Sequence, residues 1–371
     1  MKALVFTRDP YPPDERVERG LLLLSEMVDE ILFVAPKGHE NIPEYIPSNV
    51  SIKYISLFRP FTISIPIISS KFIREYKPEI AYFHNFPPMM RLFNKIKKSP
   101  IYIVDKHELW VELSREFSSN QFIKNINHIL LHSWESAEVR LPDKVIIPTI
   151  EMGQYLSSRY KIPINKFIEI QNVIDLNTLS EIKYSNLAEG FYVTYTGSLD
   201  KLRILDKVIE AFKWIDQKDI KLLIVGGKPK NRYDYLKRYT SKLGLEEKVI
   251  FTGQVPFDFM LGYIAQSEIC LVPHKCTTIT QIGFPNKITY YMALGKPVIT
   301  TPLKSILSRI SDGICIWDGK DPKKLAELIL KLYHDDNLRS KLGARGKDLV
   351  YKKFSWGVEE KKLRAFYQSI L

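Results

Sequence analysis

The chain has 371 residues, which is too long for one ordinary hydrophobic core and fits two domains. Hydrophobic residues make up 45% of it, enough to fill two cores. Its cysteines, Cys270, Cys276 and Cys315, are odd in number and lack metal-ligand spacing, so we expect buried thiols in a reducing cytoplasm rather than a disulfide framework or a zinc site. The formal charge of +12 attracts polyanions, phosphorylated ligands or anionic lipids, and by itself it does not indicate which of these the protein binds.

The amino terminus "MKALVFTRDP" is unlike a signal peptide, and no hydrophobic run reaches the roughly 18 to 20 residues of a membrane span. We therefore expect an unprocessed cytoplasmic protein.

Short apolar segments rich in β-branched residues recur in the first half of the chain. They are continuous rather than alternating, which is typical of strands buried on both faces. They begin at Ala3, Glu30, Ile80, Ile101 and Lys144. Helical patterns lie between most of them, at residues 16–28, 87–98, 121–140 and 151–160. This alternation predicts a parallel, doubly wound α/β sheet.

A polar stretch, "QNVIDLNTLSEIKYSNLAEG", is the expected linker, and the strand pattern resumes after it. The new strands are expected to begin at Phe191, Ile220, Lys248, Ile269, Pro297 and Ile314. We predict two Rossmann-like domains facing a cleft, residues 1–178 with 354–371 and residues 190–353. Ligands of such sheets bind beyond the carboxyl ends of the strands.

Several chemistries lack their usual motifs. No Gly-x-Gly-x-x-Gly follows the first strand, and there is neither a P-loop nor an Asp-x-Asp pair. Hydride transfer, kinase chemistry and metal-dependent sugar transfer are therefore disfavoured, and we expect no metal.

Two segments of the second half suggest a phosphate site. In "YTGSLDKLRILDKVIEAF", Gly197 and Ser198 end a strand, and Arg203 precedes a helix. In "GFPNKITYYMALGKPVIT", a helix is expected to begin near Asn286 and Lys287, with its positive end toward the cleft. Backbone amides and these cations can bind a pyrophosphate and stabilise it as a leaving group. The alternative is a set of solvated loop charges and a surface lysine.

The first half offers polar residues at strand ends. "IVDKHELW" places His107 and Glu108 after a strand, although a histidine there can be purely structural. Asp14 and Arg16 lie at the start of the first expected helix, where they can also be simple capping residues.

Eight segments together resemble the group 1 family of retaining glycosyltransferases with the GT-B fold, over nearly the whole chain. They are "DERVERG", "DKHELW", "QNVID", "YTGSLDKLRILDKVIEAF", "VIFTGQVP", "CLVPH", "GFPNKITYYMALGKPVI" and "FSWGVEEKKLRAFYQSIL". The resemblance implies transfer of a sugar from a nucleotide-diphosphate donor, held by the second domain, to an acceptor in the first. It implies retention at the anomeric carbon and no cofactor.

The resemblance also implies roles for individual residues. Arg203 matches a basic residue on the donor diphosphate, His107 matches a histidine near the transferred sugar, and Lys287 completes the expected catalytic set. Ser198 stands where a second arginine is common. The donor-binding candidates are Gly197, Ser198, Gln254, Val255, Gly283, Phe284, Asn286 and Tyr290. The acceptor-side candidates are Asp14, Arg16 and Glu108.

The chain departs from the family at two positions. The family motif carries two glutamates eight positions apart, and here Ile282 and Tyr290 occupy these positions. The ribose contact, and with it the donor, stays open. One rival hypothesis is a non-catalytic GT-B subunit that regulates a partner transferase. The other is a nucleotide-sugar epimerase, which requires acid/base carboxylates in the cleft.

Family acceptors are often lipid-linked, so we expect a glycan or lipid-linked acceptor in cell-envelope or polysaccharide synthesis. "PPMMRLFNKIKKSP", from Pro87, fits a basic amphipathic helix, and "LFRPFTISIPIISS", from Leu57, fits an apolar loop. Both suit the anionic inner face of a cell membrane. A core-facing helix with solvated lysines explains the first segment equally well. No nucleic-acid recognition motif accompanies the charge, so we expect no nucleic-acid partner.

Overall fold

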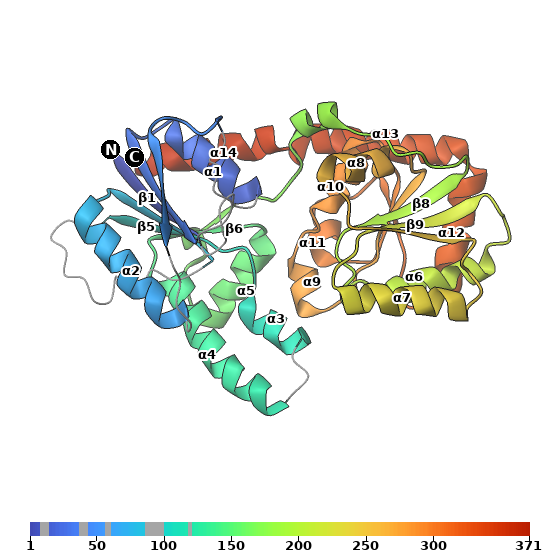
Figure 1. Cartoon of the computed structure of the whole chain (residues 1–371), viewed down its shortest axis with the longest axis horizontal. Coiled ribbons are helices and arrows are strands. Elements are labelled where there is room, and N and C mark those ends of the chain that lie inside the picture. Colours follow the sequence, from blue (N-terminus) through green and yellow to red (C-terminus); the bar gives the residue numbers. More distant parts are fainter. Residues whose placement is uncertain (8–14, 37–43, 56–60, 86–99, 118–120) are drawn as a thin grey trace. The chain divides into compact units, whose positions relative to one another are not determined.

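The computed structural model describes residues 1–7, 15–36, 44–55, 61–85, 100–117 and 121–371. The chain folds into two compact units, Met1–Gln171 with Glu360–Leu371, and Asn172–Glu359. Each unit is a parallel sheet covered by helices (Figure 1), which confirms the predicted doubly wound α/β class.

The first unit contains a seven-stranded parallel sheet in the order β3-β2-β1-β4-β5-β6-β7. Its strands are β1 (Lys2–Phe6), β2 (Glu30–Pro36), β3 (Val50–Ile55), β4 (Ile80–His84), β5 (Ile101–Asp105), β6 (Lys144–Ile147) and β7 (Phe167–Glu169). Its helices are α1 (Glu15–Ser25), α2 (Phe61–Tyr76), α3 (Trp110–Phe117), α4 (Gln121–Arg140) and α5 (Ile150–Tyr160). The edge strands β3 and β7 were not predicted, because β3 is half exposed and β7 has only three residues.

One predicted segment of this unit differs. The apolar stretch from Leu57 is helical from Phe61 onward, as α2, rather than a loop. Phe72, Ile73 and Tyr76 have helical spacing, and they pack against the core of the sheet. The predicted basic helix at residues 87–98 lies outside the described residues. None of the helices in the described ranges is long and apolar enough to cross a membrane.

The second unit contains a six-stranded parallel sheet in the order β10-β9-β8-β11-β12-β13. Its strands are β8 (Phe191–Thr196), β9 (Ile220–Val225), β10 (Val249–Gly253), β11 (Ile269–Val272), β12 (Val298–Thr300) and β13 (Ile314–Ile316). Its helices are α6 (Leu205–Ala211), α7 (Lys230–Lys242), α8 (Phe257–Ala265), α9 (Thr278–Ile282), α10 (Lys287–Ala293), α11 (Lys304–Leu307), α12 (Pro322–His334) and α13 (Asp336–Lys353). The last helix, α14 (Trp356–Ile370), begins here and ends in the first unit.

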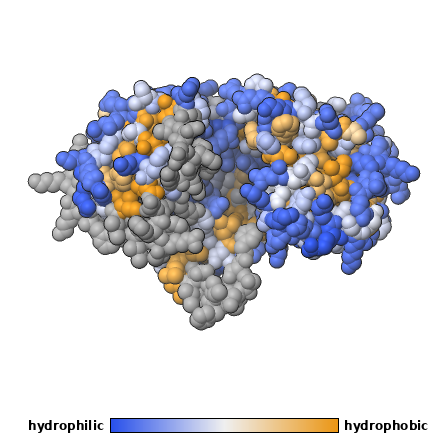
Figure 2. Space-filling model, in the orientation of Figure 1, coloured by the Kyte–Doolittle hydropathy of each residue, from blue (hydrophilic) through white to orange (hydrophobic). Residues whose placement is uncertain are grey.

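Both faces of the second sheet are apolar, as continuous hydrophobic strands require. Tyr195 and Leu222 pack in a core with residues of α6, α7 and α12. Cys270 and Val298 pack on the other face with residues of α8, α10 and α13. Figure 1 shows the two helical layers on opposite sides of β8 and β9. The surface over α6 and α7 is largely hydrophilic (Figure 2), as expected for the outer faces of these helices.

The boundaries between the units differ from the predicted ones. Residues 172–178 and 354–359 belong to the second unit. The Ile174 amide donates to Thr289 Oγ1 at 3.1 Å, and Ile174 forms a parallel bridge with Ser355. Phe354 stacks on Phe284 with ring centroids 5.8 Å apart. These contacts attach both connecting segments to the second core, so the linker motif is part of that core.

Candidate functional site

The second sheet has a topological switch point at β8. The chain proceeds from β8 to β9 on one side and returns to β11 on the other, and ligands of doubly wound sheets bind at such a point. The loops after β8 and β11 pair there, because Arg203 forms an antiparallel bridge with His274. The Ile204 amide also donates to Pro273 O at 2.9 Å. The fold therefore places Arg203 at the expected crevice.

Arg203 forms a long ion pair with Asp200, with NH1 3.6 Å from Oδ1, and its guanidinium also interacts with the Tyr195 hydroxyl. Asp200 is occupied locally, since its carboxylate accepts from the Ser198 hydroxyl and the Leu202 amide, both at 2.8 Å. Within the described chain, the buried Nε of Arg203 has no hydrogen-bond partner. The guanidinium thus retains donor capacity for a ligand.

Lys287, the first residue of α10, is buried under the end of β8. Its Nζ donates to Thr196 O at 2.5 Å and to Tyr195 Oη at 3.0 Å, and it lies 4.1 Å from the centroid of the Tyr195 ring. A Cβ at Gly197 would lie 2.8 Å from this Nζ, and Gly197 has φ +114°, so the approach requires glycine.

The protein surroundings of Lys287 destabilise a charge on its side chain. Burial removes its hydration and Arg203 repels it, so the pKa of Lys287 lies well below its ordinary value despite attraction by Asp200. Two basic side chains thus lie near one strand end, and Asp200, the carboxylate beside them in the described part of the chain, is already engaged. Such a group of charges favours an anionic ligand.

A pocket of about 260 Å³ adjoins this cationic site. It is formed by the ends of β8, β9 and β10 and by α8, and its lining residues are Gly197, Ser198, Val225, Gly226, Gly227, Lys228, Gln254, Val255 and Met260. The predicted donor-binding residues Gly197, Ser198, Gln254 and Val255 therefore come together here. The ends of β8 and β9 approach so closely that a Cβ at position 226 would clash with the carbonyl oxygen of Gly197. The close approach is therefore possible because residue 226 is glycine.

The other four predicted donor-binding residues do not line this pocket. Gly283 O accepts from the Ser305 hydroxyl at 2.7 Å, and Phe284 stacks on Phe354. Asn286 precedes the seven-residue helix α10, and its carbonyl accepts from the Thr289 hydroxyl at 2.7 Å.

The two positions where the family carries glutamates are also occupied by the core. Ile282 and Tyr290 are 8% and 6% exposed, and the Tyr290 ring packs edge-on against Phe257 at 5.5 Å. These side chains hold the helix that presents Lys287.

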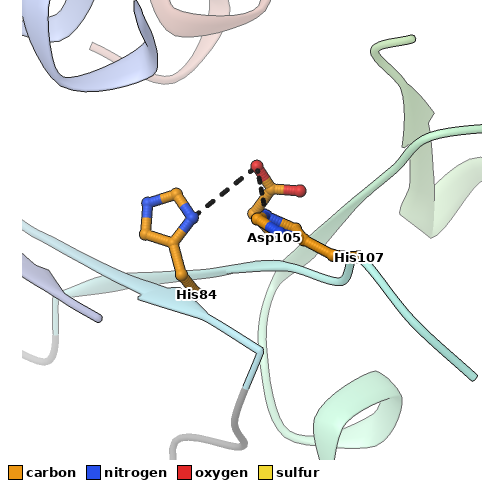
Figure 3. Close-up of side chains that lie close together, drawn as sticks. All are labelled: His84, Asp105 and His107. Carbon is orange, nitrogen blue, oxygen red and sulfur yellow. Dashed lines mark ion pairs between the residues drawn. The ribbon is translucent and has the colours of Figure 1, made fainter. Parts of the chain in front are cut away.

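A second polar cluster lies in the first unit, at the ends of β4 and β5 (Figure 3). The rings of His84 and His107 both lie beside Asp105, with Nδ1 and Nε2 respectively at 3.8 and 3.5 Å from Oδ2. The His107 amide donates to Asn85 Oδ1 at 2.8 Å, which fixes the start of its loop. The structure therefore gives the predicted His107 a buried carboxylate partner.

Arg16 neutralises this carboxylate. Its Nε and NH2 donate to the two oxygens of Asp105 at 3.0 and 2.9 Å, and its NH1 donates to Ile170 O at 2.6 Å. Although burial opposes ionisation, Arg16 and the neighbouring histidines hold the pKa of Asp105 well below its usual range. Arg16, predicted on the acceptor side, is thus committed to positioning Asp105.

His84, Asp105 and His107 also have ligand atoms close enough for a metal ion. The fit is poor, because a divalent cation there would meet a guanidinium that already binds both carboxylate oxygens. Of the remaining acceptor-side candidates, Glu108 is exposed, and Asp14 lies outside the described residues.

Sequence reasoning missed several partners in both clusters. Tyr195, Asp200 and His84 were not selected as site residues. His84 ends a strand, which was a usable signal. The contacts of Tyr195 and Asp200 depend on tertiary packing.

Comparisons with known proteins agree with this geometry. Residues 190–335 match the family described as Glycosyl transferases group 1. A capsular polysaccharide biosynthesis glycosyltransferase, CapM of Staphylococcus aureus, is 27% identical over 210 residues, which cover 53% of this chain and 51% of that protein. The uncharacterized glycosyltransferase MJ1069 of Methanocaldococcus jannaschii is 20% identical over 343 residues, covering 90% of this chain and 83% of that protein.

Solved structures extend the likeness to the whole fold. Anabaena Alr3699/HepE, crystallised in complex with UDP, superposes with a TM-score of 0.73 at 15% identity, over 100% of both chains. The chain thus has the GT-B fold, and its second unit matches the family of group 1 glycosyl transferases.

Proposed function

We propose that the protein is a retaining glycosyltransferase that transfers a sugar from a nucleoside-diphosphate donor to a glycan or lipid-linked acceptor in cell-envelope polysaccharide synthesis. The observation that supports this proposal most directly is that Arg203 and Lys287 lie at the switch point of the second sheet, beside a pocket of about 260 Å³. The UDP complex of HepE and the capsular role in the name of CapM support this donor and product class.

The chemistry follows from where the cations lie. The bond between the anomeric carbon and the diphosphate oxygen breaks, and its electron pair passes to that oxygen, where Arg203 and Lys287 stabilise the charge. The acceptor hydroxyl attacks from the same face, and its proton passes to the leaving oxygen. This route needs neither a carboxylate base nor a metal ion, and it accommodates Ile282 and Tyr290. In this proposal His107 contacts the transferred sugar.

A donor screen tests the proposal. The protein is incubated with UDP-, GDP- and other nucleotide sugars, with and without membrane lipid extract, in the presence and absence of EDTA. We expect one pairing to release nucleoside diphosphate at a rate that EDTA does not change. Retention is read from the anomeric configuration of the product by NMR. Release without retention would contradict the stereochemical part, and the absence of both release and nucleotide binding would refute the proposal.

Variants test the individual roles. Arg203→Ala should lower kcat by about 10²- to 10³-fold, because a charge contact to the leaving group is lost. The matched control is Arg238→Ala, which removes an exposed arginine of α7 and should leave the rate unchanged. His107→Ala should also lower kcat while leaving UDP affinity near that of the wild type. Equal rates for wild type and Arg203→Ala would remove Arg203 from the mechanism.

The alternative is a non-catalytic GT-B subunit, and one observation favours it. Ile282 and Tyr290 bury apolar and aromatic side chains where the family carries glutamates. Such a subunit binds UDP or another nucleotide but releases none from any sugar donor, even with lipid extract. Binding without turnover in the complete screen would therefore select this alternative.

A further inference from the structure

His274 follows β11 and is buried at the same switch point. The residue is 5% exposed, and its Nε2 has no hydrogen-bond partner among the described residues. Its backbone is fixed, because it pairs with Arg203 and its carbonyl accepts from the Thr301 hydroxyl at 2.7 Å. A buried polar atom without a partner costs free energy, and in a native structure it calls for a functional explanation.

The charged neighbours of His274 come from two other elements. Arg203 lies in the loop after β8, and Lys287 begins α10. Burial, followed by repulsion from Arg203 and then from Lys287, places the pKa of His274 well below its ordinary value. Asp200, the carboxylate beside Arg203, already accepts bonds from Ser198 and Leu202. These surroundings favour the neutral imidazole.

We propose that His274 is a third ligand of the anionic diphosphate, and that its imidazole takes up a proton when the diphosphate binds. The inference rests on the proposed function of the neighbouring site. The protonated ring donates from Nε2 to a phosphate oxygen, which satisfies the buried nitrogen. The incoming negative charge also offsets the mutual repulsion of His274, Arg203 and Lys287.

The sign of the pH dependence follows from this exchange. Without ligand, the pKa of the ring lies well below its ordinary value, and in this proposal a bound diphosphate raises it. Between these two values the complex carries one more proton than the free protein, so affinity for the diphosphate rises as pH falls. Lys287, whose pKa is also depressed, contributes to the uptake by the same logic.

Calorimetry with UDP tests the proposal on the full chain. Titrations at about pH 7.5 in buffers of different ionisation enthalpy give the number of protons taken up per UDP. We expect net uptake by the wild type. His274→Gln should bind UDP about 10- to 100-fold more weakly, because a charge-assisted bond is lost, and should take up fewer protons. The control is His334→Gln, which changes an exposed histidine of α12 and should behave as wild type.

A second measurement does not depend on how the variant folds. Ring-nitrogen NMR of the wild type should show His274 changing from neutral to protonated on addition of UDP or inorganic pyrophosphate, but not of uridine. A ring that stays neutral, or a folded His274→Gln variant with wild-type affinity and proton uptake, would overturn the proposal and leave the glycosyltransferase proposal intact. Absence of UDP and pyrophosphate binding by the wild type would instead overturn both.

Discussion

Replacement of Lys287 by methionine tests two roles of this side chain, its contact with the ligand and its contribution to stability. Methionine fills a similar volume but has no charge. In the proposed mechanism, Lys287→Met therefore loses a donor to the leaving group, and kcat should fall by about 10²- to 10³-fold. It also loses the bonds to Thr196 O and Tyr195 Oη, which contribute about 1 kcal/mol each to stability. The methionine side chain carries no charge that must be buried, and this partly offsets the loss of stability.

The pH dependence of the free energy of unfolding measures the cost of burying the charge of Lys287. Because the pKa of Lys287 is lower in the folded protein than in the unfolded chain, the unfolded state binds more protons in the interval between the two values. In that interval, up to about pH 10.4, the free energy of unfolding of the wild type should rise relative to Lys287→Met, with a limiting slope of about 1.4 kcal/mol per pH unit.

The assay is urea unfolding followed by circular dichroism at about pH 7, 8 and 9, with UDP binding measured at each pH. Lys242→Met, at the exposed end of α7, is the matched control and should keep the wild-type slope and UDP affinity. A Lys287→Met variant with the same slope and the same UDP affinity as the wild type would refute both the burial argument and the phosphate contact.

Two further predictions concern the supporting structure. Asp105→Asn should lower the free energy of unfolding by about 3–5 kcal/mol at neutral pH, because Arg16 loses a buried partner; the difference should shrink in acid as Asp105 protonates, and urea unfolding at several pH values checks this. Equal stability at neutral pH would contradict it. Gly226→Ala should abolish UDP binding, because the new Cβ clashes with Gly197 O, whereas Gly357→Ala, with open space around it, should bind UDP normally by calorimetry.

The two parallel sheets could be predicted from the sequence because most of their buried strands are continuous apolar runs. Exceptions occurred where burial is partial, as in β3, or where a stretch such as α2 carries an apolar pattern that suits more than one structure. The arrangement of the candidate site residues was only partly predictable. Arg203 and Lys287 follow from strand-end and helix-start patterns. The pairing of Arg16 with Asp105 joins residues 89 positions apart, and no local pattern indicates it.

The two polar clusters differ in charge balance, and this difference indicates where an anion binds. In the first unit, Arg16 neutralises the charge of Asp105, and His107 lies beside this ion pair. In the second unit, Asp200 faces both Arg203 and Lys287, while Ser198 and a backbone amide occupy its oxygens. An added phosphate would upset the first balance and relieve the repulsion in the second. This electrostatic difference supports our proposal that the second unit binds the donor diphosphate, and the argument does not depend on any sequence motif.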